Sequence, residues 1–188
     1  MPINLPNLVT LLRILLIPLI VGIFYLPDEW LSFEGKNIAA TGVFVFAAIT
    51  DWLDGYLARK LNQMSAFGAF FDPVADKLVV IGALIVLLHL NRIDMVVALI
   101  IIGREIAVSA LREWMARVGQ AKSVAVAFIG KLKTVLQMVA IPLLLFADEL
   151  FGIVECHALG TVLIYIAAVL TVVSMLYYLR RALPLAQG

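Results

Sequence analysis

The chain has 188 residues, of which 64% are hydrophobic and only 14% are charged, and its mean hydropathy is +1.08. These values exclude an ordinary soluble globular domain and predict an all-α integral membrane protein. The formal net charge of +1 says little as a sum, because in a membrane protein the position of each charge along the chain matters more.

The whole chain, residues 1–188, is predicted to form one domain, a single bundle of six transmembrane helices, because no Ser-, Gly- or Pro-rich linker divides it. Its one cysteine cannot form an internal disulfide. We also expect no cleaved signal peptide, since no basic segment precedes Arg13 and no small-residue cleavage site follows the first apolar run. No nucleic-acid partner is expected.

The first predicted helix covers residues 8–26 and follows a short interfacial segment, residues 1–7, in which Asn7 is a suitable N-cap. A run of this length can cross a hydrocarbon core of about 30 Å. Thr10 and Arg13 lie three residues apart and therefore share a face. Arg13 is either a residue that snorkels to the membrane surface or one that binds a substrate, and the sequence leaves both open.

The second apolar run, residues 38–50, is too short to span a membrane and becomes long enough only by continuing to about residue 60. Residues 62–68 are predicted to form a turn. Asp72 and Pro73 then supply a suitable N-cap and first helical position for a third helix that ends near residue 90.

Three more helices are predicted, at residues 95–117, 124–146 and 158–179, with polar turns at residues 119–123 and 148–157. Lysine and arginine gather at one end of the six predicted helices, and of these residues only Lys36 and Arg92 fall at the other end, which collects acidic residues instead. By the positive-inside rule, the basic end faces the cytoplasm.

Four aspartates interrupt the otherwise apolar second and third helices. A lone aspartate at the centre of a membrane helix costs about 2.5 to 3.5 kcal/mol, so a group of four requires compensation. Asp51 and Asp54 share one helix face, and Asp72 and Asp76 share another, so that two helices can direct two carboxylates each to one point. Carboxylate oxygens suit Mg²⁺ or Mn²⁺, and four of them suit one or two such ions.

The residues around the aspartates help to choose between uses of this site. Gly55, Ala58 and Gly68 leave room for a large group close to the backbone, and Arg59 can neutralise a phosphate. The alternatives are a proton or cation pathway, or ion pairs with Arg59 and Lys77. A relay does not need glycines at fixed distances from its acids, so the pattern favours metal-assisted chemistry.

The same pattern resembles the signature of the CDP-alcohol phosphotransferases at eight positions with their spacings: Asp51, Asp54, Gly55, Ala58, Arg59, Gly68, Asp72 and Asp76. This resemblance implies six membrane helices, usually in a homodimer, and displacement of CMP from a CDP-linked lipid or alcohol. It also implies that the four aspartates hold two divalent ions, Mg²⁺ or Mn²⁺, and that Asp76 is the general base. The CMP and CDP-lipid site would be formed by Asp54, Gly55, Ala58, Arg59 and Gly68.

Four further stretches, residues 4–14, 67–77, 103–116 and 130–138, resemble the bacterial branch of that family that uses CDP-diacylglycerol and sn-glycerol 3-phosphate in phospholipid biosynthesis. The resemblance implies a multi-pass protein of the bacterial inner membrane, surrounded by membrane lipids, with its active site facing the cytoplasm. A sibling transferase with serine or an inositol phosphate as acceptor is the first alternative, and a cation transporter is the second.

A glycerol phosphate dianion that approaches an anionic pyrophosphate needs cations besides the metal ions. The candidates for this acceptor site are Arg104, Arg112, Lys131, Lys133, Thr10 and Arg13. Arg104 and Arg112 lie two turns apart on nearly one helix face, and arginine suits bidentate phosphate contact. The alternatives are that Arg112 pairs with Glu105 or Glu113, and that Lys133 snorkels to lipid head groups.

Overall fold

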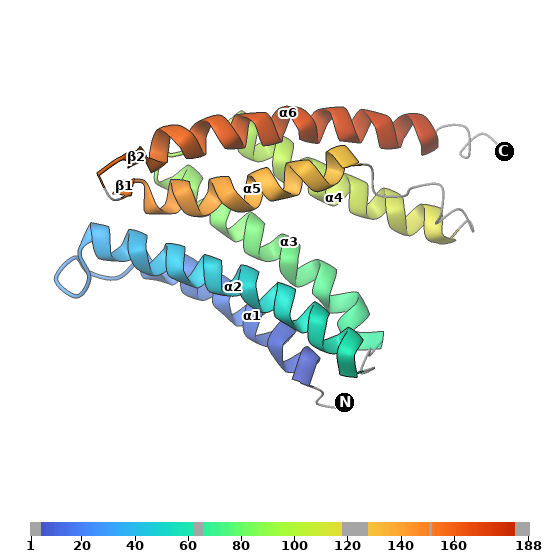
Figure 1. The fold of residues 1–188 in the computed structure, drawn as a ribbon, viewed down its shortest axis with the longest axis horizontal. Coiled ribbons are helices and arrows are strands. Elements are labelled where there is room, and N and C mark those ends of the chain that lie inside the picture. Colours follow the sequence, from blue (N-terminus) through green and yellow to red (C-terminus); the bar gives the residue numbers. More distant parts are fainter. Residues whose placement is uncertain (1–4, 62–65, 118–127, 151, 183–188) are drawn as a thin grey trace.

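The computed structural model is an all-α bundle, with six helices and one short hairpin in the part of the chain that it describes (Figure 1). The backbone is described for residues 5–61, 66–117, 128–150 and 152–182, and the side chains for residues 8–51, 71–117, 129–150 and 152–180. The all-α class and the predicted number of helices are confirmed in these ranges.

The first two helices begin earlier than the apolar runs indicate. Helix α1 spans Leu5–Ile23 and helix α2 spans Phe33–Leu61. Asn7, the predicted N-cap, therefore lies inside α1. The Ser32 hydroxyl accepts a hydrogen bond of 3.2 Å from the backbone N–H of Gly35, which identifies Ser32 as the cap of α2. Polar residues that follow this cap belong to the helix instead of the connecting turn.

Helix α3 spans Ala66–His89, so the prediction that it begins at Asp72 and Pro73 is wrong. A proline removes its own backbone hydrogen bond from a helix, but the chain can stay helical on both sides of it. Gly68, which the sequence places in the preceding turn, therefore lies in α3. Because the helix begins earlier, Asp72 is a helix-interior residue whose side chain is free to serve the site instead of capping the helix.

The remaining helices are close to their predicted ranges. Helix α4 spans Met95–Arg117, as predicted, and the Asp94 carboxylate caps it by accepting a 2.7 Å hydrogen bond from the N–H of Val96. Helix α5 spans Phe128–Phe146 and helix α6 spans Cys156–Ala182. The predicted start of the fifth helix and the turn before it lie outside the described residues.

A hairpin that the sequence does not predict joins α5 to α6. Strand β1, Glu149–Leu150, pairs antiparallel with strand β2, Val154–Glu155. Gly152 has a positive φ of 66°, a left-handed conformation that glycine adopts without steric cost. Two residues per strand are too few to leave the alternating pattern from which strands are predicted.

The helices pack around one large apolar cluster and a small second cluster formed by Val108, Met115 and Tyr178. Helix α1 contacts α2 and α3, α5 contacts α2 and α6, and α4 contacts α6 (Figure 1). Helices α5 and α6 lie close together at Gly160, where an added Cβ would lie 2.8 Å from Leu144 Cγ and 3.2 Å from the Ala140 carbonyl oxygen. The buried core is made of small and branched side chains, including Ala40, Phe44, Ala83, Leu84, Leu87, Ile101, Ile141 and Ile164.

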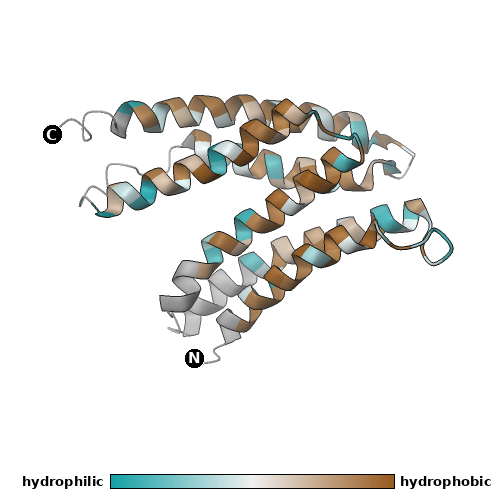
Figure 2. Cartoon of the chain, turned by 180° about the vertical axis from the view of Figure 1, so that it is seen from behind, coloured by the Kyte–Doolittle hydropathy of each residue, from teal (hydrophilic) through white to brown (hydrophobic). Residues whose placement is uncertain are grey.

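The outside of the bundle is also apolar, and the helices are hydrophobic over most of their drawn length (Figure 2). Each helix exposes large aliphatic side chains, among them Leu15, Ile49, Ile85, Leu99, Val135 and Val169. Within the described residues, two helical segments are long and apolar enough to cross a membrane, Ile129–Phe146 and Cys156–Arg180, and a shorter apolar segment covers Leu8–Ile23. Helix α4 carries five charged residues and is less hydrophobic than α3, which carries Asp72, Asp76 and Lys77.

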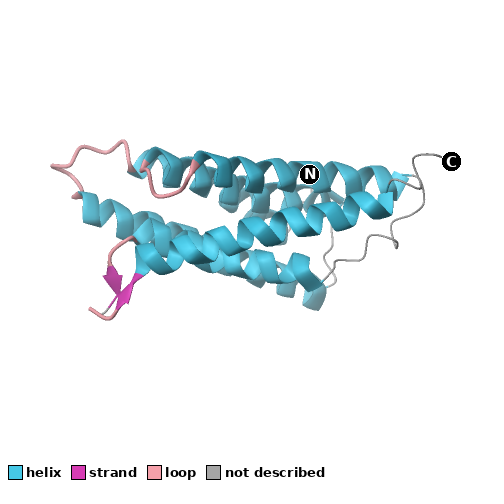
Figure 3. Cartoon of the chain, turned by 90° about the horizontal axis from the view of Figure 1, so that it is seen from above, coloured by secondary structure: helices cyan, strands magenta, loops and turns pink. Residues whose placement is uncertain are grey.

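The described loops and the hairpin gather at one end of the bundle (Figure 3). This end carries most of the acidic loop residues: Asp28, Glu29, Asp94, Asp148, Glu149 and Glu155. Asp51, Arg112 and Lys133 belong to the halves of their helices that lie toward the opposite end. The fold therefore brings the functional candidates of five helices to one half of the bundle.

Candidate functional site

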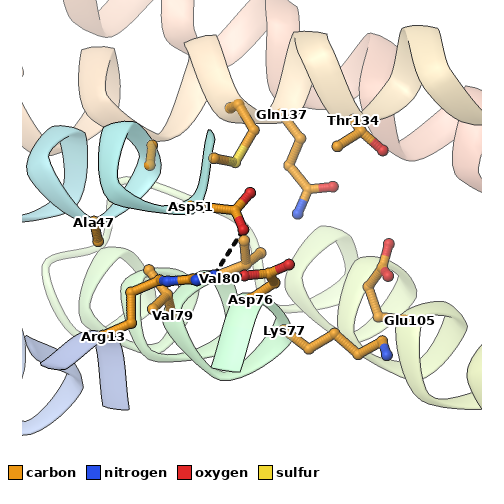
Figure 4. A pocket seen from close by; sticks show the side chains of 12 residues that line it. Arg13, Ala47, Asp51, Asp76, Lys77, Val79, Val80, Glu105, Thr134 and Gln137 are labelled. Atoms are coloured by element: carbon orange, nitrogen blue, oxygen red, sulfur yellow. Dashed lines mark hydrogen bonds and ion pairs between the residues drawn. The ribbon is translucent and has the colours of Figure 1, made fainter. Parts of the chain in front are cut away.

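A cavity of about 230 Å³ lies between α1, α2, α3, α4 and α5. Its polar lining combines acidic, basic and neutral side chains: Arg13, Asp51, Asp76, Lys77, Glu105, Thr134 and Gln137 (Figure 4). The remaining lining residues are apolar or small. Two of the four predicted aspartates thus face the same cavity as residues of α4 and α5, which are distant in sequence.

Arg13 joins the acids of α2 and α3. Its Nη1 atom donates a 2.7 Å hydrogen bond to Oδ1 of Asp51, and the same atom contacts Oδ1 of Asp76. The Arg13 side chain is 1% exposed, whereas those of Asp51 and Asp76 are 45% and 44% exposed. The guanidinium is therefore buried beneath the two carboxylates, which keep an open side toward the cavity. Snorkelling of Arg13 to the membrane surface does not fit this arrangement.

Asp72 is held by the same helix. The Thr10 hydroxyl donates a hydrogen bond to Oδ1 of Asp72, one turn of α1 before Arg13. Helix α1 thus fixes three of the four aspartates through two residues. The residues predicted to form the CMP and CDP-lipid site belong by position to α2 and α3, but their side chains lie outside the described residues: Asp54, Gly55, Ala58, Arg59 and Gly68.

The described carboxylates fit a hard cation in one respect. Oxygen atoms from Asp51 and Asp76, on different helices, approach a single positively charged atom of Arg13. Carboxylate oxygens are the ligands that Mg²⁺ and Mn²⁺ prefer. Among the side chains that the structure describes, no group of three or more His, Cys, Asp or Glu residues forms a complete metal site. Metal binding by the four aspartates stays a prediction.

A second charged cluster lies across the cavity, between α4, α5 and α6. Lys133 donates a hydrogen bond to Oε1 of Glu105, and Nη1 of Arg104 lies 3.3 Å from the same oxygen. Nη2 of Arg104 donates a 3.1 Å hydrogen bond to the Ser174 hydroxyl on α6. Lys133 and Arg104 are only 3% and 6% exposed, so Lys133 does not snorkel to lipid head groups. Glu105 supplies the negative charge that two buried cations need.

Tyr178 brings Arg112 to this cluster. Nη2 of Arg112 donates a 3.1 Å hydrogen bond to the Tyr178 hydroxyl, and the guanidinium carbon lies 5.3 Å from the ring centre. The guanidinium carbon of Arg104 lies 5.9 Å from the same ring. Both distances suit a cation–π contact. The structure therefore pairs Arg112 with a buried aromatic ring, and neither Glu105 nor Glu113 is its partner in a salt bridge among the described residues.

The other sequence candidates are placed differently. Lys131 is exposed on α5 and does not line the cavity. Lys77 lines the cavity and extends along it toward Glu105 (Figure 4). Arg104 retains a buried Nε atom that has no hydrogen-bond partner within the described part of the chain. A buried donor of this kind is costly unless something binds it, and an anion is suitable.

Several residues of the site were not among the sequence candidates, namely Glu105, Thr134, Gln137, Ser174 and Tyr178. Glu105 could have been selected from the sequence, because an acidic residue within an apolar helix is as unusual there as the four aspartates are in theirs. Ser174 and Tyr178 are ordinary residues for a membrane helix, so the sequence alone gave no reason to select them. The cavity is thus lined by Asp51 and Asp76 on one side and by Glu105 on another, and the buried cations Arg104 and Lys133 contact Glu105 from behind this lining.

Comparison with known proteins covers almost the whole chain. The family model described as CDP-alcohol phosphatidyltransferase matches residues 3–173. Proteins named CDP-diacylglycerol–glycerol-3-phosphate 3-phosphatidyltransferase from Escherichia coli (strain K12) and Shigella flexneri are each 48% identical to the chain over 184 residues, which is 97% of this chain and 96% of the relative. The matched ranges include the four aspartates and the cations of α4 and α5.

Proposed function

The chain belongs to the CDP-alcohol phosphatidyltransferase family, and on this premise we propose that it transfers the phosphatidyl group of CDP-diacylglycerol to sn-glycerol 3-phosphate. The products are phosphatidylglycerophosphate and CMP, in phospholipid biosynthesis. One observation of the structure supports the proposal above all: a single cavity joins Asp51 and Asp76 to the Glu105 cluster with its buried cations. The choice of acceptor follows the names of relatives that are 48% identical to the chain.

The carboxylate wall is assigned to the donor. Asp51, Asp54, Asp72 and Asp76 would hold one or two Mg²⁺ or Mn²⁺ ions, which when bound neutralise charge on the pyrophosphate. Helix α1 supports this wall, since Arg13 bonds Asp51 and Asp76 and Thr10 bonds Asp72. These contacts favour a positioning function for Thr10 and Arg13 over direct binding of the acceptor. The CMP portion would lie against Asp54, Gly55, Ala58, Arg59 and Gly68.

The chemical step is a displacement at phosphorus. Asp76, whose side chain is 44% exposed at the cavity, accepts the proton of the acceptor 1-hydroxyl. The hydroxyl oxygen forms a bond to the phosphorus attached to diacylglycerol, the bond from that phosphorus to CMP breaks, and CMP leaves with the electron pair. A carboxylate is a weak base for an alcohol, so the positioning of the two substrates must lower much of the barrier.

The cationic wall, which consists of Arg104, Arg112 and Lys133 around Glu105, is assigned to the acceptor phosphate. Arg104, Arg112 and Lys133 converge there through Glu105 and Tyr178. The buried Nε atom of Arg104, which lacks a partner among the described residues, supports binding of an anion at this wall. Lys131 stays an acceptor candidate at the edge of the site. Fixed cations of this kind also reduce the repulsion between the phosphate dianion and the pyrophosphate.

We also propose that all six helices span the bacterial inner membrane, with the cavity open toward the cytoplasm and the chain assembled as a homodimer. The exposed aliphatic side chains on every helix support the membrane assignment. The acidic loop end of the bundle, opposite the half that contains Arg112 and Lys133, supports the orientation by the positive-inside rule. Cross-linking of single-cysteine variants in intact membranes tests both the orientation and the dimer.

The acceptor is tested with purified protein and CDP-diacylglycerol labelled in the phosphatidyl group. Glycerol 3-phosphate, serine and inositol phosphate are supplied in turn, and CMP and the labelled lipid are both quantified. The proposal requires phosphatidylglycerophosphate and CMP in equal amounts with glycerol 3-phosphate alone. Product with serine or inositol phosphate in its place would identify a sibling transferase. Ion flux without CMP release would identify a transporter.

A further inference from the structure

Gln137 is the buried polar residue of the cavity whose presence packing does not explain. Its side chain is 4% exposed, and it lines the cavity from α5. Within the described part of the chain no hydrogen bond of its amide is found, and its polar atoms are not among the fully buried ones that lack a partner. The amide therefore keeps access to the cavity that its side chain lines. A ligand that displaces water from this amide must replace the hydrogen bonds that the amide loses.

The place of Gln137 in the cavity identifies which part of a ligand it meets. Figure 4 shows the amide directed away from its helix into the cavity, and in that view it lies between Asp51 and Glu105. Asp51 belongs to the carboxylate wall, where the reacting hydroxyl is expected, and Glu105 holds the cations that are assigned to the acceptor phosphate. The amide is thus positioned against the middle of a bound acceptor.

The spacing of Lys133 and Gln137 along α5 also places the amide against the middle of the acceptor. Lys133 and Gln137 are four residues apart, so they lie on one helix face with a rise of about 6 Å between them. A phosphate near Lys133 therefore places the central carbon of glycerol 3-phosphate near Gln137. An amide can both donate to and accept from a hydroxyl, whereas the carboxylates and cations nearby can do only one of these.

Building on the proposed function, we propose that the Gln137 amide binds the C2 hydroxyl of the acceptor and so makes the site specific for a polyol phosphate. The neighbouring Thr134 does not compete for this position, because its hydroxyl already donates a 3.0 Å hydrogen bond to the Gly130 carbonyl oxygen. An acceptor without a hydroxyl beside the reacting carbon leaves the buried amide unpaired in the complex. Such an acceptor is disfavoured for that reason.

The test compares two acceptors on three forms of the full-length protein. The acceptors are sn-glycerol 3-phosphate and 3-hydroxypropyl phosphate, which lacks only the C2 hydroxyl. The proteins are the unsubstituted chain, Gln137→Met, which keeps the length of the side chain, and Thr134→Val, which removes a polar group from the same wall. The measured quantity is the ratio of kcat/KM for the two acceptors. This ratio does not depend on the folded fraction of each preparation, so partial loss of folding does not obscure it.

The unsubstituted chain and Thr134→Val should both prefer glycerol 3-phosphate, by about tenfold or more. Gln137→Met should reduce this preference to about twofold or less, with the KM for CDP-diacylglycerol unchanged. A preference that survives in Gln137→Met overturns the inference, as does a rise confined to the KM for CDP-diacylglycerol, which would place the amide on the lipid. If neither acceptor supports CMP release, the proposed function fails instead.

Discussion

Arg13 on α1, whose side chain is 1% exposed, donates a 2.7 Å hydrogen bond through Nη1 to Oδ1 of Asp51 on α2. The same nitrogen contacts Asp76 on α3. One internal cation therefore lies beneath two carboxylates that we propose as metal ligands, and it offsets their mutual repulsion. A divalent ion bound at these oxygens has to share them with Arg13 or displace it.

Substitution Arg13→Gln should destabilise the metal-free protein by about 1.5 to 3 kcal/mol, the range for hydrogen bonds to charged groups. Added Mn²⁺ should then raise the melting temperature more in the variant than in the unsubstituted chain, because the ion no longer competes with the guanidinium. Thermal unfolding in detergent and calorimetric titration with Mn²⁺ measure the two effects. Equal Mn²⁺ affinity in both proteins would show that Arg13 and the ion use different oxygens.

Arg117→Gln is a matched control for this experiment. Arg117 also pairs with an acid, Glu113, at 2.6 Å, but the two side chains are 77% and 66% exposed. Exposed pairs of this kind contribute about 0 to 1 kcal/mol. The control should leave both the melting temperature and the response to Mn²⁺ almost unchanged.

Glu105 gives a second test of buried charge. Glu105→Gln leaves Lys133 and Arg104 without their negative partner, although they are 3% and 6% exposed. We expect a loss of about 2 to 4 kcal/mol in unfolding free energy, near the range for breaking a buried ion pair. Glu113→Gln breaks only an exposed pair and should cost less than about 1 kcal/mol. Similar melting temperatures for the two variants would mean that the Glu105 cluster contributes little to stability.

Arg112 should affect the acceptor and not the donor. Its guanidinium donates a 3.1 Å hydrogen bond to the Tyr178 hydroxyl and lies over the buried ring, so that two contacts position it near Arg104. Lysine keeps the charge but loses the planar fork, so Arg112→Lys should raise the KM for glycerol 3-phosphate about tenfold. The KM for CDP-diacylglycerol should stay within about twofold in the same assay. An increase in both constants would argue for a general loss of structure.

The sequence was sufficient to predict that the acids of two helices face one site. Asp51 and Asp76 meet because each lies on the polar face of an otherwise apolar helix, and such residues turn inward in a membrane protein. The sequence was misleading at Asp72 and Pro73, which together resemble the first residues of a helix but lie inside α3. The pairing of Ser32 with Gly35, which marks the true start of α2, depends on a backbone geometry that composition does not reveal.

The contacts between helices could not be predicted in the same way. That Arg13 reaches Asp51, and that Glu105 reaches Lys133, depends on the rotation and depth at which the helices pack. The apolar periodicity of each helix is compatible with several rotations and depths of packing. The sequence therefore supplied the chemical groups of both walls, and the structure supplied Glu105, Gln137 and Tyr178, which connect or extend them.

The most direct test of the account is Asp76→Asn, measured for both turnover and donor binding. Asparagine keeps the size of the side chain and its contact with Arg13 but cannot accept the acceptor proton. We predict that CMP release in the presence of glycerol 3-phosphate falls by at least about a hundredfold, while the Kd for CDP-diacylglycerol changes by less than about threefold. Near-normal CMP release by Asp76→Asn would contradict the assignment of Asp76 as the general base and, with it, the proposed reaction centre.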